Sequence, residues 1–278
     1  MDPTARHELV LTPGAAITAR RAGRELWAAR DVVRAFAVRS LRIRYRQAAL
    51  GALWAVAQPL ALLVPFAAFL ASDVDRPGAA PYAASALAAL IGWGYLSSAV
   101  TNGAGALVNE AFLVRKTWFP REAPVLAAVL APLVEVTLGL GLYAVAGPLL
   151  GARLGWGLVT LPLLVAALAI VAASLALPLA ALNALFRDVR HALPFVVLLW
   201  LFVSPVAYPI ERVTDEGRLL YAFANPAAGP LDGFRRVLAE GTWPDLTLLG
   251  ASMTTALVVG TIGHRLFRRL APTLPDLV

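Results

Sequence analysis

Residues 154–186 read LGWGLVTLPLLVAALAIVAASLALPLAALNALF, a run of 33 residues without an ionisable side chain between Arg153 and Arg187. A helix needs roughly 20 apolar residues to cross a hydrocarbon core of about 30 Å. The run is long and apolar enough for this, and a helix satisfies its own backbone hydrogen bonds in lipid. It therefore predicts a membrane protein built from helices.

The composition of the whole chain supports this prediction. Of the 278 residues, 59% are hydrophobic and 15% are charged, and the mean hydropathy is +0.72. Ordinary soluble domains have about 25% charged residues, enough to cover their exterior. The chain has no cysteine, which excludes disulfides, thiolate metal sites and cysteine nucleophiles.

Five further windows of low charge have the length of a span. One of them, 77–109, exceeds a single span, and we expect another helix to begin after Thr101. Another ends in SPVAYP (204–209), which should break the helix. We expect an all-α polytopic membrane protein with six transmembrane helices, at about residues 49–71, 82–101, 123–147, 158–182, 192–210 and 246–263.

The basic residues favour one orientation. With residues 1–47 and 265–278 in the cytoplasm, 18 Lys and Arg lie inside and six outside, as the positive-inside rule requires. The net charge of +7 then follows from topology, and we expect no nucleic-acid partner. The expected parts are a cytoplasmic region 1–47, a transmembrane domain 48–264 with an external region 211–245, and a cytoplasmic tail 265–278.

The chain lacks the residues that nucleotide hydrolysis, metal binding and triad catalysis require. Lys116 is the single lysine, and no phosphate-binding loop surrounds it. His7, His191 and His264 lie in separate segments, which disfavours a metal site or a catalytic triad. We therefore expect neither a metal, a cofactor nor an enzymatic site in this chain.

An arginine-rich helix precedes the first expected span. Its spacing places Arg39, Arg42 and Arg46 on one helix face. A generic positive-inside anchor at the lipid surface is one interpretation. The other is that Arg42, Arg44, Tyr45 and Arg46 recognise a diphosphate head group at a cytoplasmic portal, because Arg binds phosphate bidentately.

Two cytoplasmic connections carry candidate contact residues. In the segment 109–122 the aromatic and basic side chains form either a surface for a soluble partner or a connector at the headgroup level. Between the fourth and fifth spans, Arg187 and Asp188 either contact a partner or belong to a capped, positive-inside turn. The candidates of the first segment are Phe112, Leu113, Arg115, Lys116, Trp118, Phe119 and Pro120.

The placement of the external region 211–245 has two interpretations. Asn225-Pro226 and Gly229-Pro230 interrupt the apolar pattern of this region, so we expect two short helices, either re-entrant or lying on the outer surface.

Glu135 is the one ionisable residue well inside an expected span. It acts either as a packing hydrogen bonder or as a proton relay.

Aromatic residues in or near the spans are belt and packing residues or, if some face a lumen, flat surfaces for sugars. The candidates are Trp54, Trp93, Tyr95, Trp200, Phe202 and Tyr208.

Five segments, in order along about residues 25–269, resemble the ABC-2 type permeases that export O-antigen, teichoic acid and related polysaccharides. They are Arg44-Tyr45-Arg46 with Leu50-Gly51, Trp54 and Gln58-Pro59; KTWFPRE (116–122); NALFRDVRH (183–191); Ser204-Pro205-Val206 with Tyr208-Pro209; and Asn225-Pro226 with Gly233-Phe234-Arg235.

The resemblance implies a permease in the cell membrane of a bacterium, formed as a homodimer with two copies of a separate ATPase subunit that binds ATP and Mg. It implies that the helix before the first span is a gate helix, that about 109–120 is a coupling helix docking on the ATPase, and that 211–245 is re-entrant. The implied cargo is a glycan on a polyprenyl diphosphate. A permease for a drug or small lipid, a proton-coupled carrier using Glu135, and a membrane enzyme are the alternatives.

Overall fold

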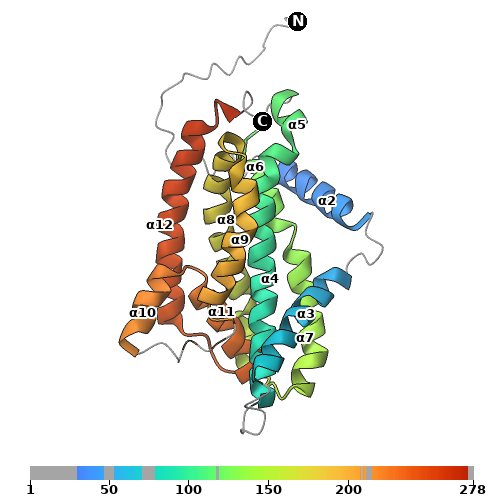
Figure 1. The fold of residues 1–278 in the computed structure, drawn as a ribbon, viewed down its shortest axis with the longest axis vertical. Helices are drawn as coiled ribbons and strands as arrows, with labels where there is room; N and C mark the ends of the chain where they lie inside the picture. The colour runs from blue at the N-terminus through green and yellow to red at the C-terminus, as the bar shows by residue number, and fades with distance from the viewer. Residues whose placement is uncertain are drawn as a thin grey trace, which may run out of the picture.

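A computed structural model describes residues 30–46, 53–70, 79–116, 119–206, 208, 210 and 215–274. Within these ranges every regular element is helical, so the all-α prediction is confirmed there. The longer helices run side by side and form an elongated bundle (Figure 1).

Helix α4 forms the centre of the bundle. It packs against most of its neighbours, above all α8, and α8 in turn packs against α12. The approach of α4 to α8 is close because Gly103 has no side chain: a Cβ there would lie 2.6 Å from Cβ of Ala176. Small residues at helix contacts are typical of membrane bundles. The helices of the bundle are α3 (Leu53–Leu70), α4 (Ala79–Asn109), α6 (Glu122–Leu130), α7 (Leu133–Leu149), α8 (Leu161–Leu185), α9 (Asp188–Val203) and α12 (Leu246–Leu270).

Four helical segments of the described chain are long and apolar enough to cross a membrane. They are Tyr82–Asn109, Glu122–Leu149, Trp156–Leu185 and Leu246–Leu270. They coincide with the second, third, fourth and sixth expected spans, so the chain is a multi-pass membrane protein. The first and fifth expected spans correspond to α3 and α9, which have 18 and 16 residues, and the number of six spans stays a prediction.

Two helix boundaries differ from expectation. No new helix begins after Thr101, because α4 continues unbroken to Asn109, and its sequence there contains no proline that would interrupt it. The expected helix 123–147 is divided into α6 and α7 at Ala131 and Pro132. Pro132 has no N–H to donate to Ala128, and its ring crowds that carbonyl.

The expected break at 204–209, within the last residues of the fifth expected span, is confirmed. Helix α9 ends at Val203, and Ser204 is extended, with φ −91° and ψ 154°. This is the conformation that a residue before proline prefers.

The segment 211–245 contains the two expected short helices, α10 (Asp215–Ala224) and α11 (Ala228–Arg235), followed by a π-helical turn, η4 (Arg236–Glu240). All residues of α11 are buried, and α11 contacts α4, α8 and α12. A 3-10 turn, η2 (Trp156–Thr160), packs against η4. Whether these helices re-enter a membrane stays a prediction.

Candidate functional site

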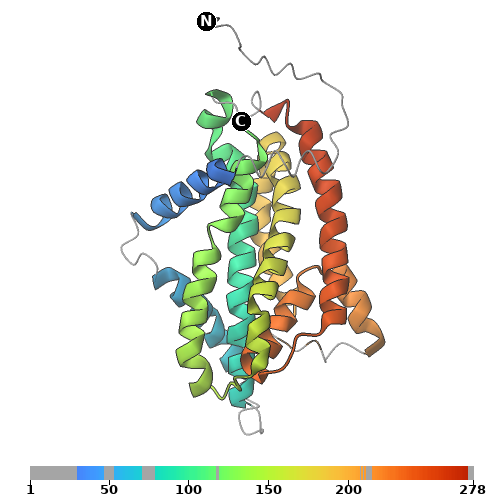
Figure 2. The ribbon, with the colours of Figure 1, turned by 180° about the vertical axis from the view of Figure 1, so that it is seen from behind.

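Helix α2 (Arg30–Arg46) lies across the long axis of the bundle, at the end that carries α5 (Ala111–Lys116), as Figures 1 and 2 show. It packs against α6. Val32 and Phe36 turn toward the core, and the ring of Phe36 lies 5.3 Å from the ring of Phe119. An amphipathic helix in this position has the geometry of a helix in the membrane interface.

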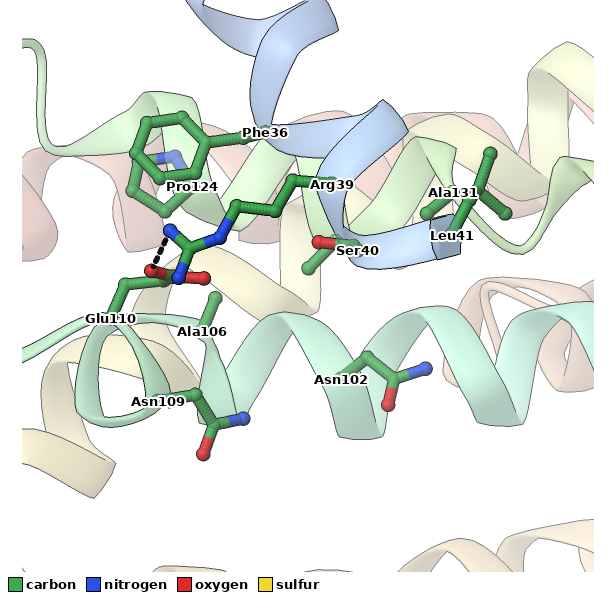
Figure 3. A pocket seen from close by; sticks show the side chains of 11 residues that line it. Phe36, Arg39, Ser40, Leu41, Asn102, Ala106, Asn109, Glu110, Pro124 and Ala131 are labelled. Atoms are coloured by element: carbon green, nitrogen blue, oxygen red, sulfur yellow. Dashed lines mark hydrogen bonds and ion pairs between the residues drawn. The ribbon is translucent and has the colours of Figure 1, made fainter. Parts of the chain in front are cut away.

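Arg39 and Glu110 form an ion pair that joins α2 to the end of α4. Nη1 of Arg39 donates to Oε2 of Glu110 at 2.7 Å. The Arg39 side chain is 50% exposed and that of Glu110 is 16% exposed. Figure 3 shows the guanidinium reaching from α2 toward the carboxylate. The sequence pointed to Arg39 but not to its partner, because no spacing rule pairs residues so far apart in the chain.

A pocket of about 360 Å³ lies beside this pair, between α2, α4 and α6 (Figure 3). Its lining is mostly apolar and carries a few charged, amide and hydroxyl side chains, a composition suited to orienting a polar ligand group. The lining residues are Phe36, Arg39, Ser40, Leu41, Asn102, Ala106, Asn109, Glu110, Pro124, Ala128 and Ala131.

The other predicted head-group residues are placed only in part. Arg42 is exposed on α2. The backbone of Arg44, Tyr45 and Arg46 completes α2, and their side chains lie outside the described part. Their predicted contact with a head group stays a prediction.

Helix α5 presents one anchored and several exposed side chains. Val114 is fully buried, whereas Phe112 is 66% exposed, and the ammonium of Lys116 lies 4.4 Å from the centre of the Phe112 ring. Leu113 is half-buried and Arg115 is exposed. The aromatic and cationic face of α5 is therefore exposed, and such side chains are common at protein interfaces.

The segment after α5 turns back into the bundle. Phe119 is buried, Pro120 is half-buried, and the guanidinium of Arg121 lies 5.1 Å from the centre of the Phe119 ring. Burial lowers the pKa of Arg121 from its ordinary value. Trp118 lies outside the described residues.

Arg187 and Asp188 are exposed where α8 turns into α9, at the same end as α5 (Figure 1). Arg187 is the N-cap of α9 and makes no side-chain capping bond. Asp188 lies in the first turn, where a carboxylate is favoured by the helix dipole.

A second ion pair, which the sequence did not indicate, connects α6 to α12. Oε1 of Glu122 lies 2.7 Å from Nε of Arg268, and the Glu122 side chain is 7% exposed. Buried acids are held in this way by paired cations. The expected third span begins just after Glu122, so the sequence predicted no burial of its carboxylate.

The predicted channel aromatics have different surroundings. Trp93 and Trp200 meet edge to face with centroids 5.3 Å apart, and the buried Tyr95 hydroxyl donates to the Val129 carbonyl at 3.2 Å. Phe202 is 58% exposed. The Tyr208 hydroxyl donates to the Val203 carbonyl at 2.8 Å. The Trp54 side chain lies outside the described residues. A sugar would reach Trp93 or Tyr95 only after the surrounding helices moved, and the role of the set stays a prediction.

A polar network around Asn225, where α9 meets the corner between α10 and α11, was not predicted from the sequence. The Asn225 side chain accepts from Trp200 Nε1 at 3.0 Å and from the Ala227 N–H at 3.1 Å, and it donates to the Ser204 hydroxyl at 3.1 Å. Nearby, Asp232 is 1% exposed and lies 2.7 Å from Nε of Arg236. Asn225, Asp232 and Arg236 belong to the expected external region 211–245, whereas Trp200 and Ser204 belong to the fifth expected span.

Glu135 lies in the first turn of α7 and is half-buried. It lines a small cavity between α3, α4 and α7, together with Gln58, Tyr95 and Gly139. Both interpretations, packing and proton relay, remain predictions. In the described ranges no three His, Asp or Glu side chains gather as a metal site would require.

Comparison with known proteins decides the family. Residues 31–239 match the family described as ABC-2 type transporter. The chain belongs to this family. The matched region begins in α2 and ends in η4, so the pocket and α5 of this ABC-2 chain belong to the family domain.

Curated relatives cover nearly the same length. The chain is 29% identical over 237 residues to the O-antigen export system permease protein RfbA of Myxococcus xanthus, covering 85% of this chain and 91% of the relative. It is 24% identical to a protein of the same name from Klebsiella pneumoniae, covering 84% and 89%. The resemblance stated from the motifs is thereby confirmed.

Proposed function

We propose that this ABC-2 chain is the transmembrane subunit of an exporter that moves a polyprenyl-diphosphate-linked polysaccharide, such as O-antigen or teichoic acid, out of a bacterial cell. The observation that carries the proposal is the similarity to O-antigen export permease proteins along nearly the whole chain. The arginine-bearing pocket under α2 supports it, since a diphosphate needs cationic donors at the membrane interface.

The proposed assembly is a homodimer with two copies of an ATPase subunit, in the inner or plasma membrane, with both termini of this chain in the cytoplasm. The partner binds ATP and Mg, because this chain has no phosphate-binding loop around Lys116. Exposed apolar side chains on α9, among them Phe195, Leu199 and Phe202, offer a surface for the second copy or for lipid.

In this proposal α5 is the coupling helix. Closure of the ATPase dimer on ATP pushes the exposed face of α5, where Phe112 and Lys116 lie, and Arg187 and Asp188 flank it. Because α5 directly follows α4, the central helix of the bundle, a push on α5 is transmitted to the core.

Helix α2 is the proposed gate. Arg39 and Arg42, with Arg44, Tyr45 and Arg46 at its end, would receive the diphosphate as the lipid enters from the cytoplasmic leaflet. The glycan would follow between the two permease copies and pass α10 and α11 at the external side.

The test is co-purification of the chain with the ATPase encoded beside it, followed by ATPase assays with and without a polyprenyl-diphosphate-linked glycan. We expect a stable complex of two permeases and two ATPases that the glycolipid stimulates. A chain that purifies without an ATPase overturns the proposal. Stimulation by small lipids or drugs but not by the glycolipid identifies a different cargo, and loss of transport in Glu135→Gln without loss of folding identifies a proton-coupled carrier.

A further inference from the structure

We propose that the carboxylate of Glu110 occupies the place of the substrate's phosphate on Arg39, and that an arriving diphosphate displaces it and so signals occupancy to α5. This inference rests on the proposed function, because it takes the polyprenyl diphosphate as the ligand. It adds to that function a carboxylate that competes with the head group for Arg39. It also adds a route from the head-group pocket to the coupling helix.

The first support is the nature of the Arg39–Glu110 pair. Its single short contact of 2.7 Å joins a guanidinium that is 50% exposed to a carboxylate that is 16% exposed. The half-exposed guanidinium stays in contact with water, which screens its attraction to the carboxylate, so the pair is weaker than one that is buried on both sides. The exposed part of the guanidinium is accessible to an arriving anion, which can replace the carboxylate as its partner.

The second support is chemical equivalence. A guanidinium presents its N–H groups as a planar fork that fits the two oxygens of a carboxylate or a phosphate equally well. A diphosphate carries more negative charge than a carboxylate and is the stronger competitor at the same site. The adjoining pocket of about 360 Å³ also offers amides of Asn102 and Asn109 and the hydroxyl of Ser40, which can donate to phosphate oxygens.

The third support is the position of Glu110 in the chain. Its N–H donates to the Ala106 carbonyl at 3.1 Å, as the last bond of the α4 ladder, and its own carbonyl accepts from Leu113 and Val114 at 2.9 and 3.0 Å. Glu110 is thus the residue that joins α4 to α5. A force on its side chain acts directly on the start of α5.

The contacts of α2 extend to the other end of α5. Phe36, one turn before Arg39, packs against Phe119, which follows α5 in the chain. The helix α2 therefore touches the chain on both sides of α5, at Glu110 and at Phe119. When Arg39 turns to a diphosphate, the released Glu110 carboxylate faces a second anion and is repelled, which moves this junction away from α2.

The experiment uses the full permease–ATPase complex in nanodiscs of phosphatidylcholine, with ATPase rate measured against the concentration of undecaprenyl diphosphate. In Glu110→Gln the competing charge is removed while the shape of the side chain is kept. We expect the half-saturating concentration of the diphosphate lipid to fall several-fold, and the maximal stimulation to fall as well, because the repulsive step is lost.

A second variant separates the ion pair from phosphate binding. The exchange Arg39→Glu with Glu110→Arg restores an opposite-charge pair but places a carboxylate on α2. We expect the complex to fold and assemble like the wild type, with no stimulation of its ATPase by the diphosphate lipid. The matched control is Asp31→Asn, which removes an exposed carboxylate from the first turn of the same helix and should leave the titration curve unchanged.

Three further ligands identify the source of the anion. Undecaprenol tests the lipid tail alone, inorganic pyrophosphate the free anion, and phosphatidylglycerol an ordinary anionic headgroup. We expect none of them to reproduce the shift between wild type and Glu110→Gln. A shift seen equally with phosphatidylglycerol would overturn the assignment to the diphosphate carrier.

The inference and the proposed function fail in different ways. If the diphosphate lipid stimulates the wild type and Glu110→Gln has the same half-saturating concentration, the displacement of Glu110 is refuted and export stands. If Glu110→Gln and Asp31→Asn shift the curve alike, only net charge matters and the inference is again refuted. If no ATPase binds the chain, both fail.

Discussion

The indole N–H of Trp200 donates to the side-chain oxygen of Asn225 at 3.0 Å, across the break between α9 and the two short helices that follow. The same oxygen accepts from the Ala227 N–H, and the amide of Asn225 donates to Ser204. One side chain thus holds the end of α9 against the corner between α10 and α11.

Asn225→Ala should lower the free energy of unfolding by about 3 kcal/mol, because the indole, the Ala227 N–H and the Ser204 hydroxyl lose a buried partner together. Trp200→Phe keeps most of the ring and removes one donor, and should cost about 1 kcal/mol. Denaturant unfolding of the purified protein in detergent measures both. Equal losses in the two variants would show that the ring packing, not the network, holds this corner.

Glu122→Gln should lower the free energy of unfolding by about 3 kcal/mol, because it leaves the guanidinium of Arg268 without its charged partner at 2.7 Å. The double variant Glu122→Gln with Arg268→Gln should recover much of this loss, since no charge is then left in a poorly solvated position. A double-mutant cycle on thermal unfolding yields the coupling. Additive losses would contradict a direct interaction between the two side chains.

Gly155→Ala should destabilise the contact between η2 and the turn after η4. A Cβ at Gly155 would lie 2.1 Å from the Gly241 carbonyl oxygen, so the backbone must move, at a cost of about 3 kcal/mol. Gly141→Ala is the matched control, because a Cβ there meets no atom within 4 Å. In the middle of α7 it should stabilise by about 0.5–1 kcal/mol. The unfolding midpoints of both variants, measured under the same conditions, test whether the first change lowers stability and the second raises it.

Phe112→Ala and Val114→Ala should separate partner binding from folding. Phe112 is 66% exposed and Val114 is fully buried. The first change should weaken binding of the ATPase at least tenfold and leave the unfolding midpoint of the isolated permease unchanged. The second should cost about 2 kcal/mol of stability. Titration with the ATPase subunit and thermal unfolding give the two readouts, and a Phe112→Ala chain that binds the ATPase normally would exclude this face as the docking surface.

Helices whose formation depends on neighbouring residues could be predicted from the sequence. The apolar run around Leu161–Leu185 became a helix, and the helix before the first span was expected from its arginines. One wrong prediction concerned a feature that the local sequence does contain. The third expected span was predicted as one helix, whereas Pro132 divides it. A proline inside an apolar run often interrupts a helix, and the prediction followed the apolar pattern alone.

The contacts at the candidate site could not be predicted in the same way. Arg39 pairs with Glu110 and Glu122 with Arg268, and in each case the partners come from helices far apart in the chain. Asn225-Pro226 belongs to the motifs of the family resemblance, but nothing in the sequence indicated which groups the Asn225 side chain contacts. Its role exists because the end of α9 meets the corner between α10 and α11 there.

The sequence by itself determined that this chain is a helical membrane protein of the ABC-2 type, because hydropathy, charge asymmetry and short motifs are properties of neighbouring residues along one chain. Only the tertiary structure decided which charges are neutralised, which aromatics are buried and where a pocket opens. The reason is physical: the energy of a buried charge or polar group depends on the side chains packed around it, and these come from whichever helices the fold brings together.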